Sequence, residues 1–124
     1  MSSLKAKLKA KSQRKVIRSV TLDGEAVDLC RPTHPERLDV FAASKAAGEI
    51  DEDNKPLSLE SGLKLMARVV ASVMREPHTG ERVFDPGSAE DLATIFNAPW
   101  FEDLDTNAVM AAFRATVEDV RKNS

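Results

Sequence analysis

Few residues in this chain are of types that could carry catalytic chemistry: one cysteine, Cys30, and two histidines, His34 and His78. A thiol can act as a nucleophile and an imidazole as its base or as a metal ligand, if the fold brings them together. Neither histidine has a cysteine or a second histidine at zinc-ligand spacing. No serine or threonine has a recognisable base and orienting group around it. The sequence therefore predicts no catalytic residue, no zinc site and no enzymatic activity.

An acidic run at residues 51–53, Asp-Glu-Asp, raises the separate question of a calcium loop. If this run supplied the first and third ligands, Lys55 would hold the fifth position and Pro56 the place of the turn glycine. Gly62 would then replace the bidentate glutamate. The run is better explained as a solvated loop, with binding of a basic partner as the alternative. We therefore expect neither a metal nor any other cofactor.

The composition is typical of a soluble globular protein. The chain has 124 residues, of which 42% are hydrophobic and 31% charged, with five phenylalanines and one tryptophan. This length favours a single domain. No uncharged stretch is long enough to cross a bilayer, so no membrane partner is expected. The single cysteine excludes an internal disulfide and favours a reducing cytoplasm.

Charge is distributed unevenly along the chain. Residues 1–18 hold seven Lys/Arg and no acid, whereas the remainder holds eleven Lys/Arg and all twenty Asp/Glu. Residues 1–15 are therefore predicted to form a basic arm, either disordered or helical. Leu4 and Leu8 would share one side of such a helix, but a helix this short needs a surface to be stable. The acidic body and the few aromatic residues make nucleic acid a less favoured partner.

A β-hairpin is predicted around Asp23-Gly24, because this dipeptide tolerates the positive φ angles of a type I′ turn. The pairs set by a two-residue turn are Leu22 with Glu25, Val20 with Val27, and Arg18 with Leu29. The apolar side chains that then share one face are Val20, Leu22, Val27 and Leu29. The other face is polar, and Cys30 falls on it. An isolated hairpin is marginally stable, so it must pack on helices.

Two helices are predicted directly after the hairpin. The first starts at a capping box from Thr33 to Glu36 and ends before Gly48. Its apolar stripe is Leu38, Phe41 and Ala42. The second helix is the longest, capped by Ser58 and running toward Pro77. Its expected buried stripe is Leu59, Leu63, Met66, Val69, Val70, Val73 and Met74.

Two further helices complete the predicted fold. The third starts after Ser88 and stops before Pro99. The fourth starts near Asp105 or Thr106, and its stripe is Val109, Met110, Phe113, Val117 and Val120. The predicted fold class is α+β: residues 16–124 form one domain, in which the N-terminal hairpin packs on about four helices.

Five short motifs follow the hairpin in order: Glu36 and Arg37, Ala67 to Ser72, Gly80 to Phe84, Ala89 to Leu92, and Ala108 to Phe113. This order resembles that of the tail assembly chaperones of long-tailed bacteriophages and prophages, over roughly residues 1–122. The motifs are patterns of fold and turn, not catalytic signatures. The chain departs from many relatives at its end, where it continues through VEDVRKNS.

The resemblance implies a non-enzymatic protein that binds the tape measure protein, keeps it soluble and helps recruit tail tube subunits. It implies a location in the bacterial host cytoplasm and absence from the mature virion. A helical partner could be bound by helix-in-groove packing, and a homo-oligomer is a further expectation. The alternatives are another phage structural or adaptor protein, such as a head–tail connector, and a small nucleic-acid-binding regulator that uses the basic arm.

The candidate partner-binding residues lie in the basic arm and beside the proline at position 99. They are Leu4, Lys5, Leu8, Lys9, Trp100 and Phe101. The arm is a candidate because its leucines need a surface, and the aromatic pair because apolar side chains gather at a helix break. For Trp100 the favoured role is a corner of the core, with docking as the alternative.

Overall fold

The hairpin forms around Asp23-Gly24, and its register is the predicted one. The computed structural model describes residues 3–10 and 15–113. β1 (Val16–Leu22) pairs antiparallel with β2 (Glu25–Cys30), and the turn residues have φ angles of 49° and 83°. All three predicted pairs are confirmed: Leu22 with Glu25, Val20 with Val27, and Arg18 with Leu29.

The open end of the hairpin departs from strict alternation. The register shifts between Val16 and Arg18, so that Val16 pairs with Cys30. Cys30 is only 3% exposed, and the prediction that it lies on a polar face is therefore wrong. Leu29 and Cys30 are adjacent in β2 and point to opposite faces, yet both are buried, so both faces of the hairpin are covered at this end.

A third strand, β3 (Met74–Arg75), pairs with β2 and was not predicted. The sequence predicted that the long helix would continue toward Pro77, but α3 (Leu59–Val73) ends earlier. Met74 has extended backbone angles and pairs with Leu29. The edge of β2 offers backbone hydrogen bonds to Met74 and Arg75. The chain therefore leaves the helix at this point, and Met74 remains buried. The sheet order is β1-β2-β3.

The helix α2 (His34–Ala46) starts at the predicted capping box. The Glu36 N–H donates to Thr33 Oγ1 at 3.3 Å, and the Thr33 N–H donates to Glu36 Oε1 at 2.7 Å. Gly48 follows the C-cap with a φ of +73°, as expected for a residue directly after a helix. Both ends of this helix are therefore set by local sequence.

The buried face of α2 differs from the predicted stripe. Leu38 is 55% exposed and Ala42 is exposed, whereas Arg37, Val40 and Ser44 are buried. Polar residues can occupy this face because each has a partner there. Arg37 Nε donates to the Phe113 carbonyl oxygen at 2.8 Å, and Ser44 Oγ donates to Glu49 Oε1 at 2.8 Å.

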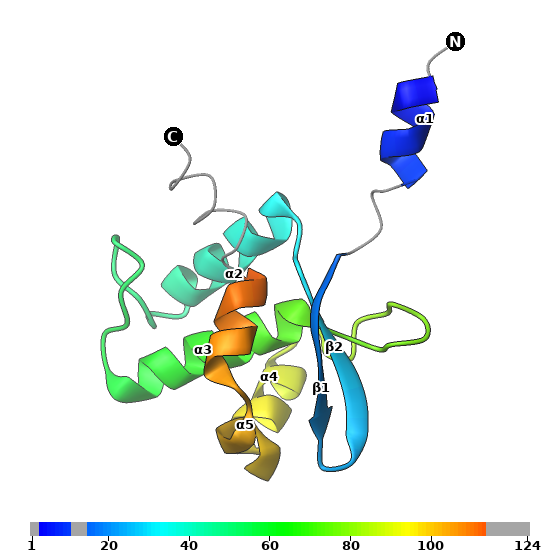
Figure 1. The fold of residues 1–124 in the computed structure, drawn as a ribbon. Coiled ribbons are helices and arrows are strands. Elements are labelled where there is room, and N and C mark those ends of the chain that lie inside the picture. Colours follow the sequence, from blue (N-terminus) through cyan, green and yellow to red (C-terminus); the bar gives the residue numbers. More distant parts are fainter. Residues whose placement is uncertain (1–2, 11–14, 114–124) are drawn as a thin grey trace.

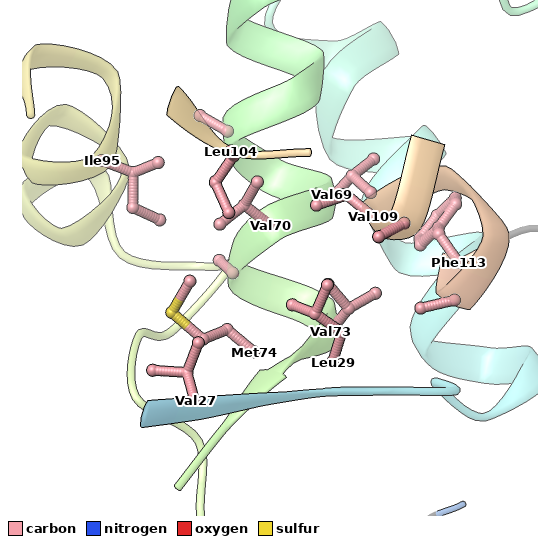
Figure 2. Close-up of a cluster of buried hydrophobic side chains, with 14 of the residues drawn as sticks. Val27, Leu29, Val69, Val70, Val73, Met74, Ile95, Leu104, Val109 and Phe113 are labelled. Carbon is pink, nitrogen blue, oxygen red and sulfur yellow. The ribbon is translucent and has the colours of Figure 1, made fainter. Parts of the chain in front are cut away.

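The C-terminal half of α3 lies at the centre of the core. Figure 2 shows its side chains between β2 on one side and the later helices on the others. The labelled core residues are Val27, Leu29, Val69, Val70, Val73, Met74, Ile95, Leu104, Val109 and Phe113. The N-terminal half is different, because Leu59 is 84% and Leu63 44% exposed. The prediction that both leucines are buried is wrong, since the sheet and α4 cover only the later turns.

Three helical segments close the other side of the core (Figure 1). α4 (Ala89–Asn97) is capped by Ser88, whose Oγ accepts from the Asp91 N–H at 3.2 Å. After the break at Pro99 comes a short helix that was not predicted, α5 (Pro99–Asp103). Residues 106–113 form the last described helix, as expected. Val117 and Val120 lie outside the described residues.

The architecture is α+β, with the hairpin on one side of α3 and the other helices around it (Figure 1). The basic arm contains a further helix, α1 (Ser3–Ala10), which is drawn clear of the other elements in this figure. No helix within the described ranges is long and apolar enough to cross a membrane.

Candidate partner-binding groove

An apolar hollow of about 700 Å³ opens beside the N-terminal half of α3. Its other walls are the end of α4, α5 and the first turn of the helix at 106–113. The apolar side chains that line it are Leu63, Met66, Val70, Phe96, Pro99, Phe101, Leu104 and Val109. We call this cavity the α5 hollow. Its volume lies in the range of ordinary binding pockets.

Two exposed leucines extend the apolar surface of the α5 hollow along α3. Leu59 and Leu63 are four residues apart, so their side chains lie on the same face of the helix. Leu63 lines the hollow and Leu59 precedes it by one turn. Contiguous apolar surface of this kind, next to a concavity, commonly marks a site of protein interaction.

A second hollow, of about 620 Å³, lies on the other side of the same half of α3. Its walls come from α2, the loop before α3 and the helix at 106–113, and its lining includes Leu38, Phe41 and Met110. The two hollows meet at Gly62 and Met66, which line both. The N-terminal half of α3 is therefore flanked by concave apolar surface on two sides.

One wall of the α5 hollow is acidic. Residues 97–109, which supply this wall, contain no Lys or Arg and three acids: Glu102, Asp103 and Asp105. Asp105 is paired with Arg18 at 3.2 Å. Glu102 lines the hollow itself. On the α3 side, Glu60 forms an exposed ion pair with Lys64 at 3.5 Å. An apolar floor with an acidic edge is complementary to an amphipathic helix with basic flanks.

The candidate residues in the arm all lie on α1. Leu4 is 67% and Leu8 60% exposed, so the described part of the chain leaves them largely uncovered. Lys5 and Lys9 belong to the same helix, whose last turn carries Lys7 and Lys9. The structure does not bring these arm residues together with Trp100 and Phe101, so the predicted candidates form two separate surfaces.

The aromatic pair on α5 divides between two environments. Trp100 is half-buried against the core and stacks on Phe84, with ring centroids 6.1 Å apart and an interplanar angle of 25°. Phe101 lines the α5 hollow and lies 6.5 Å from the ring of Phe96. Adjacent residues on a helix point in different directions. Phe101 thus faces the α5 hollow, while Trp100 packs against the core and Phe84.

Most of the residues that line the α5 hollow were not predicted as a site. Leu63 and Met66 were assigned to the buried stripe of the long helix. The one signal of a binding surface in the sequence was the length of that stripe. The helix has more apolar side chains than a short hairpin can cover. Phe96 and Leu104 carried no such signal, because they meet Leu63 only in the folded chain.

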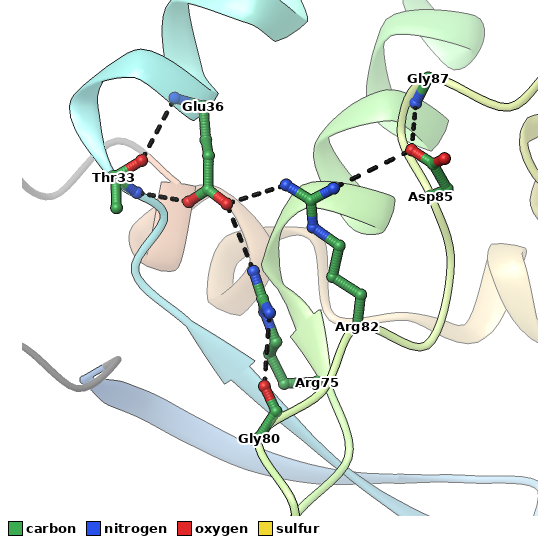
Figure 3. A network of polar contacts seen from close by, with 7 residues as sticks. All are labelled: Thr33, Glu36, Arg75, Gly80, Arg82, Asp85 and Gly87. Carbon is green, nitrogen blue, oxygen red and sulfur yellow. Dashed lines mark hydrogen bonds and ion pairs between the residues drawn. The ribbon is translucent and has the colours of Figure 1, made fainter.

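A polar network holds the segment that carries Phe84, through Arg82 and Asp85 on either side of it (Figure 3). The Glu36 carboxylate accepts from Arg82 at 2.9 Å and from Arg75 at 3.4 Å. Arg82 also pairs with Asp85 at 3.9 Å, and the Gly87 N–H donates to that aspartate at 2.8 Å. The start of α2 is therefore tied to β3 and to the loop on which α5 rests.

The described residues contain no group of three or more His, Cys, Asp or Glu side chains that could hold a metal ion. The acidic run at 51–53 is instead part of a tight loop, in which Asp51 Oδ1 accepts from the N–H groups of Asp53 and Lys55, both at 2.9 Å. Comparison with known protein families, with curated proteins and with solved structures finds no match.

Proposed function

We propose that this protein is a phage or prophage tail assembly chaperone that binds the tape measure protein. The observation that carries the proposal is the apolar α5 hollow beside the exposed Leu59 and Leu63. In this role the protein keeps the tape measure protein soluble in the bacterial host cytoplasm and helps recruit tail tube subunits. It is absent from the mature virion.

The groove beside α3 supports a mode of binding in which a partner helix lies along it. A long helical protein presents apolar side chains at three- and four-residue spacings, and the α5 hollow can receive one turn of such a stripe. The hollow receives only one turn of the partner helix, so each contact is weak and dissociates fast. Weak contacts repeated along a long partner suit a protein that must leave when the tube forms.

The proposal is tested by co-expressing the chain with the tape measure protein from the same genome. We expect the wild type to increase the soluble fraction of the tape measure protein, and Leu63→Asp to abolish that increase. Val83→Asp is the matched control, because Val83 is 38% exposed, close to the 44% of Leu63, and does not line the hollow. A wild-type chain that gives no gain in solubility would contradict the proposal.

The basic arm favours one alternative, a small nucleic-acid-binding regulator. Seven Lys/Arg in residues 1–18 could contact phosphates. That function predicts DNA binding that weakens steeply with salt and is lost when the arm lysines are replaced by glutamine. A head–tail connector, the other alternative, would be detected by mass spectrometry in purified virions, from which a chaperone is missing.

A further inference from the structure

The helix α1 is an apolar ridge with basic flanks. Leu4 and Leu8 lie four residues apart and remain largely exposed. At about 3.6 residues per turn, Lys5 and Lys7 fall on either side of the leucine pair. A helix of eight residues is marginal in water on its own, so burying its leucines against another surface would stabilise it.

The α5 hollow has the properties that complement this ridge. It is concave and apolar where α1 is convex and apolar. Glu102 lies at its edge and Asp103 follows it in the chain, whereas α1 carries lysines. The helix is about 12 Å long at 1.5 Å per residue, so two leucine side chains and their flanking lysines fit one such site.

We propose that α1 of one chain docks, through Leu4 and Leu8, in the α5 hollow of a second copy of this chain. Among the described residues both surfaces are exposed at once, so α1 does not occupy the α5 hollow of its own chain in this structure. A second copy supplies both surfaces at equal concentration. Exchange of the two arms gives a closed dimer, and head-to-tail docking gives an open chain. The proposal concerns copies of this chain alone and does not rest on the proposed function.

Sedimentation velocity of the full chain over a wide concentration range tests this association. We expect concentration-dependent self-association that weakens as salt rises, because charges flank the contact. The double variant Leu4→Ala/Leu8→Ala should weaken it by about tenfold or more, since two buried leucines are lost while alanine preserves the helix. The control is Leu57→Ala/Val83→Ala, a pair that is 61% and 38% exposed and lines neither hollow.

A mixing experiment distinguishes docking between copies from docking within one chain. Leu63→Asp alters the hollow and leaves the arm intact, whereas Leu4→Ala/Leu8→Ala does the reverse. Each variant alone should sediment more slowly than the wild type, and an equimolar mixture should regain association through one arm and one hollow. Circular dichroism of each variant checks that the fold is retained.

A charge exchange provides a second, milder test of the same contact. Glu102→Lys should weaken association several-fold, and adding Lys7→Glu to the same chain should restore part of it. Sedimentation as a monomer at every concentration would overturn the proposal, including the case in which α1 docks in its own chain. Association that persists unchanged in Leu4→Ala/Leu8→Ala would overturn it as well, because another surface would then be responsible.

Discussion

Arg68 and Glu49 form a two-point ion pair that fastens the end of α2 and its following loop to α3. Arg68 Nε donates to Oε1 of the carboxylate at 2.9 Å, and Nη2 donates to Oε2 at 3.0 Å. The two side chains are only 14% and 8% exposed. Burial raises the pKa of Glu49, but the hydrogen bonds from Arg68 and Ser44 outweigh it, and the pKa lies below its ordinary value of 4.5.

This pair predicts a specific loss of stability in acid. Because the pKa of Glu49 is lower in the folded than in the unfolded chain, its contribution is complete above about pH 4.5 and is lost as the pH falls through the folded value. Glu49→Gln should lower the free energy of unfolding by about 3 kcal/mol at neutral pH. It should also flatten the dependence on pH below 4.5. Urea unfolding across this range measures both, and an unchanged slope would contradict the assignment.

The stack of Phe84 on Trp100 predicts a measurable coupling between the loop and α5. Offset aromatic pairs contribute about 1 kcal/mol beyond the area they bury. A double-mutant cycle with Phe84→Leu and Trp100→Leu should therefore give a coupling energy of that size. Unfolding by urea, followed by circular dichroism, supplies the four free energies. A coupling near zero would show that the rings are merely neighbours.

The Glu36 carboxylate is predicted to matter more than the helix cap of which it is a part. Thr33→Ala removes one capping hydrogen bond and should cost about 1 kcal/mol. Glu36→Ala also removes the acceptor that Arg75 and Arg82 share, so it should cost about 3 kcal/mol. Thermal unfolding of the two variants compares them directly. Equal losses would mean that only the capping box contributes.

The exposed leucines of α3 are predicted to affect binding without affecting stability. Leu59→Ser changes a side chain that is 84% exposed and should leave the free energy of unfolding within about 0.5 kcal/mol. Solubilisation of the tape measure protein should nevertheless fall. Leu29→Ala, in the fully buried core, should cost about 3 kcal/mol and serves as the contrast. A large loss of stability in Leu59→Ser would place that leucine in the core.

Local signals in the sequence were sufficient for the hairpin and the helix starts. Asp23-Gly24 specifies a two-residue turn, and this turn sets the register of β1 on β2. Thr33, Ser58 and Ser88 cap the three helices that follow them. Each of these features depends on hydrogen bonds between residues a few positions apart, and such bonds can be inferred from residue types alone.

Burial, in contrast, depended on contacts between distant parts of the chain. The apolar stripe of α3 looks uniform in sequence, yet only its second half is covered, because β2, α4 and the last helix converge there. On α2, Arg37 is buried and the predicted Leu38 is not. Arg37 can be buried because the Phe113 carbonyl accepts its hydrogen bond. The α5 hollow exists for the same reason: it lies where distant helices diverge, and no local pattern encodes that space.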